Sequence, residues 1–564
     1  MVRRTRGSAH ISRPTCRYVA YPALVSTREP SRWLLILLAA GGGFLTNTAF
    51  PDRGWWPMAF VGVAALFLAL RRDRAWWNAL VGLVWGLAFF LPHIQWAQIA
   101  TDTVPWLALS VLEAVFLALF GAMWTWVRRL GFVRRNLAWQ VVTFSVLWVA
   151  VEQWRSEFPF GGFPWGRLAF SQVDSLLGRT AWLGGGLLVS LLTAAIGVLL
   201  AVFLLEARRV RSMPALCALG TAAVLLGVGL VVPLDTRAET GTLKIGAVQG
   251  NVGEPGLGSF ANRGEVLQNH VDGTVALLDE VDPGELDVVL WPENGSDLDP
   301  QTTPDVAADI DAAATAVGAP VLVGAQEFPE TGGRYNVSLL WAPGQGVIDR
   351  YAKQHPAPFG EYIPMRSFVR IFSDQVDRVT TDMIAGDEVA VVDLPSERLG
   401  RTVPLATVIC FEVAYEELVR DAVNAGAELL VVPTNNASFG YSAESTQQLA
   451  MSRLRAIETG RATVQISTVG VSGIIAPNGA LLQSTELFTA DQMIATLPLR
   501  DSLTPAVRLG YWPGWVAGGL TVLLVVAGVV SHVTRPAASA KAPARRPATK
   551  RPASKRPASK PARR

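Results

Sequence analysis

The chain has 564 residues, 50% of them hydrophobic, with 19 tryptophans and a formal net charge of only +3. This apolar content excludes an ordinary soluble protein of this size and indicates a membrane protein with a substantial water-exposed part. The 3 cysteines are far apart, Cys16 in a basic tail, Cys217 in an apolar segment and Cys410 in a polar region, so neither a disulfide framework nor a zinc site is expected.

Eight apolar segments are long enough, or nearly long enough, to cross a bilayer. They lie at residues 33–50, 55–70, 76–98, 104–127, 137–154, 181–205, 214–234 and 512–533. We therefore expect a polytopic α-helical membrane domain with eight spans, seven of them within 33–234 and the eighth at 512–533. The arginine-rich start is not interpreted as a cleaved signal peptide, because further apolar segments follow at once.

Arginines gather in alternate loops, and this pattern predicts the topology. They follow the second, fourth and sixth segments, as Arg71, Arg72 and Arg74, then Arg128, Arg129, Arg134 and Arg135, then Arg208, Arg209 and Arg211. By the positive-inside rule these loops and both termini are cytoplasmic, so residues 240–505 are extracytoplasmic. Residues 1–32 and 534–564 are expected to be basic cytoplasmic tails, the second of them disordered because Ala, Pro, Lys and Arg cannot form a core.

The loop between the fifth and sixth segments is rich in aromatic residues, glycine and proline. Phe163, Pro164 and Trp165 are predicted to lie at the level of the lipid headgroups, under the polar domain, and to line a lipid-entry site. An aromatic belt without chemistry is the alternative. Glu113, near the middle of the fourth segment, is a candidate for a functional or a bundle-facing structural carboxyl.

From Leu243 onward, short β-type runs alternate with helical ones, which predicts an α/β domain with buried sheets over residues 240–505. Strands are predicted at 243–249, 287–291, 320–325, 335–341, 389–394, 403–409, 429–433, 463–468 and 473–476. Helices are predicted at 263–280, 304–317, 415–424 and 445–459. A region of this length can form one hydrophobic core.

Three polar residues stand at the ends of apolar runs in this region: Glu293, Lys353 and Cys410. Cys410 lies at a predicted corner between a strand and a helix, which is the position of an activated nucleophile. A carboxylate base, a thiol and a positively charged oxyanion donor are the groups that covalent acyl transfer requires. The chain has only 5 histidines, so a Cys–His pair is the weaker alternative.

The combination of motifs resembles the nitrilase (carbon–nitrogen hydrolase) superfamily. The motifs are Trp291-Pro-Glu293, Lys353 with Pro358-Phe-Gly-Glu361-Tyr-Ile-Pro364, Cys410-Phe-Glu412, and Pro433-Thr-Asn-Asn436. Joined to eight spans, the set is similar to the membrane branch of that superfamily, the apolipoprotein N-acyltransferases. The resemblance covers residues 33–533 and implies an αββα sandwich for the polar domain.

The resemblance also implies a role for each residue. Glu293 would be the general base and Cys410 would carry the acyl group as a thioester. Lys353 would stabilise the oxyanion together with the backbone N–H of Phe411. Glu361 would orient Lys353, and Glu412 would be a further pocket residue.

These roles have electrostatic consequences. Lys353 and the helix start after Cys410 are expected to lower the pKa of the thiol, and a lysine between two carboxylates is expected to stay charged.

By the same resemblance, the enzyme would be an acyltransferase with ping-pong kinetics in the bacterial inner membrane. The acyl donor would be a phospholipid and the acceptor the amine of a diacylglyceryl-cysteine at the N-terminus of an apolipoprotein. A monomer without cofactor, metal or nucleic-acid partner is implied. The alternatives are a membrane-tethered amidase and a non-catalytic scaffold for a glycosyltransferase.

Three residues depart from the family pattern. Asn294 follows Glu293 where Ser, Thr or Ala is expected, and Asn436 and Ser438 stand where Asp and Trp are usual. These differences concern the loops around the site and leave Glu293, Lys353 and Cys410 in place.

Overall fold

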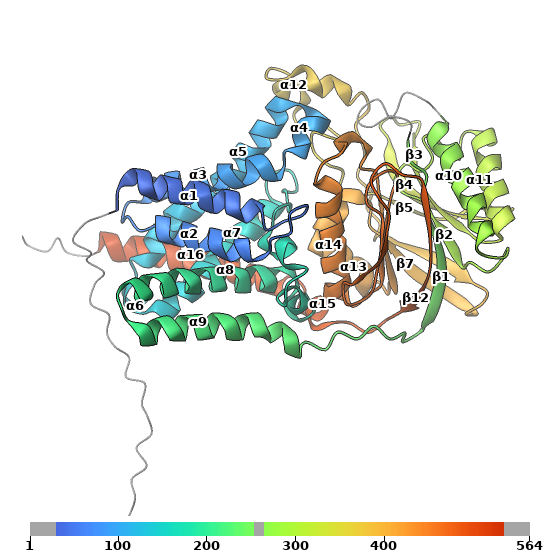
Figure 1. Ribbon diagram of the computed structural model, residues 1–564. Coiled ribbons are helices and arrows are strands. Elements are labelled where there is room, and N and C mark those ends of the chain that lie inside the picture. The colour runs from blue at the N-terminus through green and yellow to red at the C-terminus, as the bar shows by residue number, and fades with distance from the viewer. Residues whose placement is uncertain (1–29, 253–263, 535–564) are drawn as a thin grey trace, which may run out of the picture.

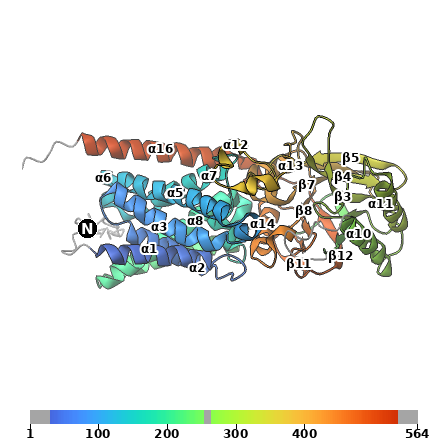
Figure 2. The same ribbon diagram turned by 90° about the horizontal axis from the view of Figure 1, so that it is seen from above.

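The computed structural model describes residues 30–252 and 264–534. Cys16 and most of the two predicted basic tails lie outside the described residues. The chain forms a bundle of long helices that adjoins a domain built on two β-sheets (Figure 1). The last helix, α16, runs along the edge of the bundle (Figure 2).

Each of the eight predicted apolar segments contains one principal helix. These are α1 (Arg32–Asn47), α2 (Pro57–Ala69), α3 (Ala75–His93), α5 (Thr103–Arg128), α7 (Leu137–Glu157), α8 (Ala181–Arg208), α9 (Ser212–Gly227) and α16 (Trp512–Val533). Among the described residues, five helical stretches are both long and apolar enough to cross a membrane: 75–93, 103–128, 178–208, 212–231 and 512–533. The helices α1 and α2 are shorter, with 16 and 13 residues, and α7 contains charged side chains near its end.

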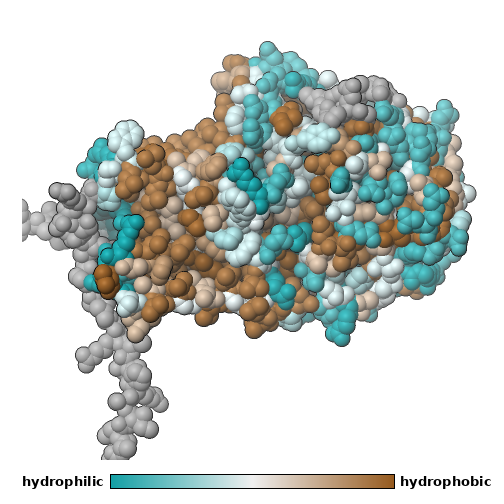
Figure 3. Space-filling model, viewed as in Figure 1, coloured by the Kyte–Doolittle hydropathy of each residue, from teal (hydrophilic) through white to brown (hydrophobic). Residues whose placement is uncertain are grey.

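The outer surface of the bundle is apolar. Leu37 on α1, Met213 on α9 and Leu523 on α16 are 69%, 70% and 67% exposed. The hydrophobic surface covers the bundle, whereas hydrophilic residues predominate over the β-domain (Figure 3). Such a surface is stable only in contact with lipid or another apolar phase, so the bundle is a membrane domain.

Small residues allow the helices to approach closely. A Cβ added at Gly82 of α3 would stand 2.0 Å from the carbonyl oxygen of Leu117 on α5. At Gly86, one turn further along α3, a Cβ would stand 2.8 Å from the Cα of Ala114. Close backbone contact of this kind is the usual way in which helices associate within a membrane.

The second domain contains two six-stranded sheets, ordered β12-β1-β2-β3-β4-β5 and β11-β10-β9-β8-β7-β6. The strands of the first sheet are β1 (Gly241–Gln249), β2 (Val288–Leu290), β3 (Val321–Glu327), β4 (Tyr335–Ala342), β5 (Gly346–Ala352) and β12 (Asp491–Leu499). Those of the second are β6 (Val391–Ser396), β7 (Arg401–Thr407), β8 (Leu429–Thr434), β9 (Thr463–Ser467), β10 (Gly473–Ile475) and β11 (Leu481–Ser484).

Helices cover both outer faces of the two sheets. The helices α10 (Glu265–Ala276) and α11 (Pro304–Val317) lie on the side away from the bundle, while α13 (Glu416–Asn424) and α14 (Glu444–Thr459) lie between the second sheet and the bundle (Figure 1). The domain therefore has the nitrilase-like αββα arrangement of layers. Helices α13 and α14 are the elements that connect the sheets to the membrane domain.

The central strands are parallel and apolar on both faces, as expected for a covered sheet. In the second sheet, Leu405 of β7 pairs with Leu429 of β8, and Val431 of β8 pairs with Val464 of β9. A hydrogen bond of 2.8 Å from Thr407 Oγ1 to Ser338 Oγ joins the two sheets. This packing brings the ends of β2, β5, β7 and β8 to one place.

Candidate active site

The three predicted residues follow three strand ends. Glu293 comes after β2, Lys353 after β5 and Cys410 after β7. Glu293 and Lys353 both extend from the first sheet and are in contact, with 3.2 Å between Lys353 Nζ and Glu293 Oε1. Both side chains are almost fully buried, Lys353 at 1% exposure and Glu293 at 5%.

Lys353 is held between two carboxylates. Its Nζ also donates to Glu361 Oε1 at 2.7 Å, and Glu361 in turn accepts from the backbone N–H of Ala357 at 2.6 Å. Burial acts to lower the pKa of Lys353, but the charges of Glu293 and Glu361 outweigh it and raise the pKa well above its ordinary value. The ammonium is therefore charged, as expected from the sequence.

Both oxygens of Glu293 are fixed by donors. Oε1 accepts from Asn336 Nδ2 at 2.6 Å as well as from Lys353, and Oε2 accepts from the backbone N–H of Asn435 at 2.8 Å. The carboxylate therefore has one orientation at the site. Asn336, buried in β4, was not singled out from the sequence, because a lone Asn in an apolar strand gives no signal of its own.

Cys410 adopts an unusual backbone conformation. Its φ is +53°, in the left-handed region that a residue with a Cβ rarely occupies. It begins the five-residue 3₁₀ turn η7 (Cys410–Ala414), and α13 starts only at Glu416. The predicted α-helix N-terminus directed at the sulfur is therefore replaced by a tight turn, since the chain must reverse direction between β7 and α13.

Two side chains from other elements contact the sulfur. Thr434 Oγ1, at the end of β8, lies 3.2 Å from Cys410 Sγ, and Gln448 Nε2, on α14, lies 3.7 Å from it. Thr434 Oγ1 also lies 2.9 Å from Gln448 Oε1, so these groups form one network around the thiol. The motif at 433–436 contains Thr434 without giving it a role, and no sequence pattern identified Gln448, because β8 and α14 meet only in the folded domain. No hydrogen bond joins the sulfur to a histidine within the described part of the chain.

The expected decrease in the thiol pKa is wrong for this structure. Burial raises the pKa of Cys410 well above its usual value, and the negative charge of Glu293 adds to this effect. Lys353 acts in the opposite direction but is outweighed. The thiol is thus protonated at rest, and it needs a base at the moment of attack.

Glu412 fixes the corner that carries the thiol. Its Oε1 accepts from Tyr351 Oη at 2.9 Å and from the backbone N–H groups of Gln354 and His355 at 2.7 and 3.0 Å. Its Oε2 accepts from the N–H of Ile409 at 2.8 Å. Burial raises the pKa of Glu412 to about 7, although Lys353 and these donors oppose the effect. Glu412 thus ties the strand end before Cys410 to the segment that follows Lys353.

Two of the three departures from the family pattern have a physical reason. Asn294 has a φ of +53°, and Asn tolerates this conformation better than Ser, Thr or Ala. Asn436 donates through Nδ2 to Glu444 Oε2 at 2.6 Å and to Gln448 Oε1 at 2.9 Å. An aspartate at that position would place a second buried carboxylate against Glu444. Nothing in the structure explains Ser438.

The aromatic loop predicted to line a lipid-entry site packs against the active-site corner. Trp165 is 1% exposed and Pro164 is buried. The ring of Trp165 stacks on Phe411 with 5.8 Å between centroids and 9° between planes, and Phe163 stacks on Phe411 at 5.9 Å. The loop is therefore packed against Phe411, the residue next to the thiol.

A glutamine of α14 links the same loop to the membrane helices. Gln447 Oε1 accepts from Trp165 Nε1 at 2.7 Å and from Trp96 Nε1 at 3.2 Å. Its Nε2 donates to the carbonyl of His93, at the end of α3, at 3.2 Å. Gln447 therefore connects α14, which also carries Gln448, to the end of α3 and to the aromatic loop.

Buried charges form a second connection between the domains. Glu416 Oε2, at the start of α13, lies 3.3 Å from Arg167 Nη1, and its Oε1 accepts from the N–H of Gly186 at 2.6 Å. Arg455 of α14 lies 3.7 Å from Glu416 and pairs with Glu458. Although burial acts to raise it, the positive charges of Arg167 and Arg455 hold the pKa of Glu416 below its usual value.

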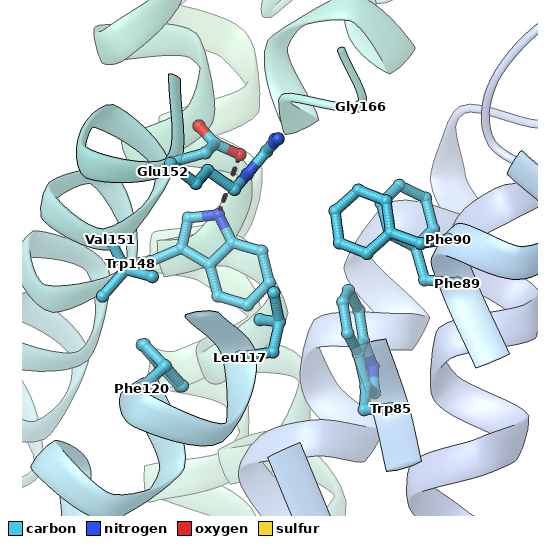
Figure 4. Close-up of a pocket in the computed structure, with 10 residues that line it drawn as sticks. Trp85, Phe89, Phe90, Leu117, Phe120, Trp148, Val151, Glu152 and Gly166 are labelled. Carbon is cyan, nitrogen blue, oxygen red and sulfur yellow. Dashed lines mark hydrogen bonds between the residues drawn. The ribbon is translucent and has the colours of Figure 1, made fainter. Parts of the chain in front are cut away.

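The membrane domain contains an aromatic cavity under the loop (Figure 4). Its lining includes Trp85, Phe89, Phe90, Phe120 and Trp148. Glu152 lies at its edge and accepts from Trp148 Nε1 at 3.1 Å (Figure 4). Glu113 is buried in the same bundle.

Glu113 forms an ion pair with a residue that supports the aromatic loop. It lies 3.2 Å from Arg155 Nη1, and this nitrogen also donates to the carbonyl oxygens of Phe163 and Trp165. Of the two alternatives for Glu113, the structure thus favours the structural role.

Comparisons with known proteins agree with this architecture. Residues 42–199 match the family model of the apolipoprotein N-acyltransferase N-terminal domain, and residues 244–502 match that of carbon-nitrogen hydrolases. An apolipoprotein N-acyltransferase of Mycolicibacterium smegmatis is 38% identical over 516 residues, which cover 86% of this chain and 84% of the relative. One of Geobacter metallireducens is 30% identical, with 86% and 94% covered.

Among solved structures, an amidase from Nesterenkonia sp. matches 49% of this chain and 96% of its own length, at 16% identity and a TM-score of 0.35.

Proposed function

The chain belongs to the apolipoprotein N-acyltransferase family, and from this membership we propose that it moves a fatty acyl chain from a phospholipid to an apolipoprotein. The acceptor is the α-amine of the diacylglyceryl-cysteine at the N-terminus of the apolipoprotein. The observation that supports this most directly is the meeting of Glu293, Lys353 and the Cys410 corner at one buried site next to a membrane domain.

In the first half-reaction, Cys410 Sγ attacks the ester carbonyl of the phospholipid while Glu293 accepts the thiol proton. The thiol is protonated at rest, so a base in contact with it is required. The C–O bond then breaks, Glu293 returns the proton to the leaving alkoxide, and lysophospholipid departs. The acyl group remains on Cys410 as a thioester.

Lys353 and the backbone N–H of Phe411 stabilise the negative charge that develops on the carbonyl oxygen. A charged donor in a buried site is effective because it is already oriented and is not screened by water. Glu361 keeps Lys353 in place through its 2.7 Å contact, and Glu412 maintains the corner that presents Phe411. These are positioning roles.

In the second half-reaction, the amine of the acceptor attacks the thioester carbonyl. Glu293 takes a proton from the attacking nitrogen, the C–S bond breaks, and the sulfur leaves as a thiol after receiving that proton. The product contains an amide, and Cys410 is free for another cycle. Ping-pong kinetics are expected because the first product leaves before the second substrate reacts.

A Cys410→Ala variant tests this mechanism. Transfer to a diacylated lipopeptide should fall by roughly 10⁴-fold or more, because no thioester can form. Incubation of the wild-type protein with phospholipid alone should add one acyl group to Cys410, detectable by mass spectrometry of the intact chain. A Cys410→Ser variant controls for the shape of the corner. Continued formation of triacylated lipopeptide by the alanine variant would rule out the mechanism.

The amidase alternative is tested in the same membranes with a small amide as substrate. Release of ammonia without N-acylation of the lipopeptide would favour the amidase. A scaffold role would leave the alanine variant fully functional in cells.

We further propose the domain limits and topology suggested by the sequence: eight spans at 33–234 and 512–533, a catalytic domain at 240–505 on the extracytoplasmic face of the inner membrane, and basic tails at 1–32 and 534–564 in the cytoplasm. The protein acts as a monomer, with no cofactor. The buried positions of Pro164 and Trp165, beside the half-buried Phe163, support a modified role for their loop, in which it forms the wall behind the acyl chain.

A further inference from the structure

A second cavity lies at the junction of α7, α8, α13, the short helix α15 (Pro505–Leu509) and α16. Its volume is ≈ 340 Å³, and Cys410, Glu293 and Lys353 are not among its lining residues. The ligand of this cavity is therefore a question separate from the proposed acyl transfer.

Arg420 is the positively charged residue that α13 contributes to this cavity, and its guanidinium is not fully satisfied. The residue is 7% exposed, and among the described residues its buried Nε has no hydrogen-bond partner. Its side chain stacks over the ring of Tyr511 at 5.0 Å. The neighbouring carboxylate of Glu416 is already bound by Arg167 and by the N–H of Gly186.

A buried donor without an acceptor is energetically unfavourable, and such groups in native proteins usually meet a ligand, ion or water. An arginine is also the residue best suited to hold a phosphate through two parallel hydrogen bonds. Arg420 therefore indicates that an anionic group occupies this cavity.

Acidic residues line the cavity as well, and Glu417 stands three residues before Arg420 on α13. Glu157, at the end of α7, and Glu417 both line the cavity. Burial and the charges of Glu157 and Glu416 raise the pKa of Glu417, and the charges of Arg420 and Arg167 oppose this effect. The other two carboxylates of the lining, Glu416 and Glu458, are paired with arginines. A positively charged group between Glu157 and Glu417 would relieve the repulsion between their carboxylates. A ligand that complements the whole cavity therefore carries a positive group as well as a negative one.

The remainder of the cavity is an apolar groove between α7 and α16. Trp154, Leu187, Trp515 and Val522 line it, and Trp515 is 72% exposed on the outer surface of the bundle. Gly518 of α16 leaves space here, since a Cβ added to it would stand 3.4 Å from Trp154 Nε1. The groove thus opens toward the surface that is in contact with lipid.

From these three features we propose that the cavity binds one phospholipid whose headgroup carries both a phosphate and a primary ammonium. Arg420 binds the phosphate, Glu157 and Glu417 bind the ammonium, and one acyl chain lies in the groove along α16. The site is separate from the thiol, and its lipid connects the catalytic domain to α7 and α16.

The test measures lipids retained by the purified full-length protein in detergent, by native mass spectrometry, after addition of equal amounts of phosphatidylethanolamine and phosphatidylglycerol. Wild-type protein should retain phosphatidylethanolamine at least tenfold over phosphatidylglycerol at this site. Arg420→Gln should lose one bound lipid per chain. The matched control Arg508→Gln removes a charge from an exposed position of α15 outside the cavity and should retain the lipid.

Two further variants keep the proposal testable if Arg420→Gln does not fold. Gly518→Leu fills the groove and should lose the lipid, whereas Gly220→Leu on α9, where a Cβ meets nothing within 4 Å, should not. Glu417→Gln should reduce the preference for phosphatidylethanolamine at least fivefold. Equal retention by the cavity variants and their controls, or equal binding of both lipids to the wild type, would overturn the proposal.

Discussion

Asn294 lies directly after Glu293 in the left-handed backbone region, and its buried Oδ1 has no hydrogen-bond partner among the described residues. The asparagine at this position thus suits the backbone conformation, and its side-chain oxygen makes no hydrogen bond there. We predict that Asn294→Gly changes the free energy of unfolding by less than about 0.5 kcal/mol, whereas Asn294→Val lowers it by about 1–2 kcal/mol. Denaturant titration of both variants in detergent checks this, and equal stabilities would contradict it.

The raised pKa of Glu444 predicts how the free energy of unfolding depends on pH. Burial, together with the charge of Glu293, raises its pKa to about 8, although Asn436 opposes this. In the native state, Glu444 therefore keeps its proton to a higher pH than in the unfolded chain, where its pKa has the ordinary value of 4.5. This contribution to stability is complete below pH 4.5 and is lost as the pH rises through 8.

Glu444→Gln removes this titration while keeping an acceptor for Asn436. We expect the two proteins to have similar melting temperatures at pH 5, and the variant to melt about 2–4 °C higher at about pH 9. Differential scanning calorimetry at both pH values measures the difference. Glu330→Gln, at an exposed position, is the control and should show no such divergence. A melting temperature of Glu444→Gln that follows wild type at the higher pH would contradict the assignment.

For single residues, the sequence identified the charged groups and the thiol that follow predicted strands. A residue directly after a strand lies at the edge of the sheet, so its approximate position follows from the strand prediction. Sequence patterns assigned no role to Thr434 and did not identify Gln448 or Asn336. These side chains have meaning only after two sheets and α14 come together. The protonated state of Cys410 was also missed, because burial and the charge of Glu293 depend on the tertiary structure.

Among the elements, α8 contains a kink on which the domain contact depends. Gly185 has a φ of +65°, and a Cβ there would stand 2.5 Å from Glu416 Oε1. Gly185→Ala should therefore lower the free energy of unfolding by about 2–5 kcal/mol, through strain and loss of the hydrogen bond to Glu416. Gly184→Ala, where a Cβ meets only the flexible side chain of Leu188, should cost less than about 1 kcal/mol. Thermal unfolding in detergent compares them, and a reversed order would contradict the role of the kink.

Gln447 connects α14 with α3, α4 (Trp96–Thr101) and the aromatic loop. Gln447→Leu leaves two indole N–H groups without their acceptor, and should destabilise the protein by about 2–4 kcal/mol. Gln447→Glu retains the acceptor and should cost less. Thermal unfolding of the two variants measures the difference. If leucine is tolerated as well as glutamate, the contacts of Gln447 do not contribute to the connection between the domains.

The elements that the sequence predicted best are those with a long regular pattern. The ranges of α11 and α16 agree with the prediction, because each has an apolar face or run of sufficient length and a proline at its start. The strands β5, β11 and β12 were missed. In β5, Asp349 and Arg350 interrupt the apolar pattern, and all four residues of β11 are exposed.

At the scale of the whole molecule, the arginine-rich loops meet at one end of the bundle. Arg128 donates to the carbonyl oxygens of Leu70 and Arg72, and Arg72 donates to that of Pro30. Burial and the positive charges of Arg209 and Arg208 lower the pKa of Arg71. The loops that come after α2, α5 and α8 are therefore neighbours, at the end remote from the β-domain (Figure 1). Such a distribution is typical of the cytoplasmic end of a membrane domain.

This distribution of charge predicts a topology that can be tested independently of the enzymatic reaction. Two proteins are compared, both with the three native cysteines replaced by serine. One carries a single cysteine in place of Arg74, in the loop before α3, and the other in place of Gln301, exposed on the β-domain. If the β-domain is extracytoplasmic, a membrane-impermeant maleimide added to cells with a permeabilised outer layer should label the cysteine at position 301 at least tenfold more than the one at position 74. Disruption of the membrane that holds the protein should make labelling equal, because both positions are exposed to water. Labelling of position 74 alone in unbroken cells would reverse the topology, and would place the thiol site in the cytoplasm and the arginine-rich loops outside.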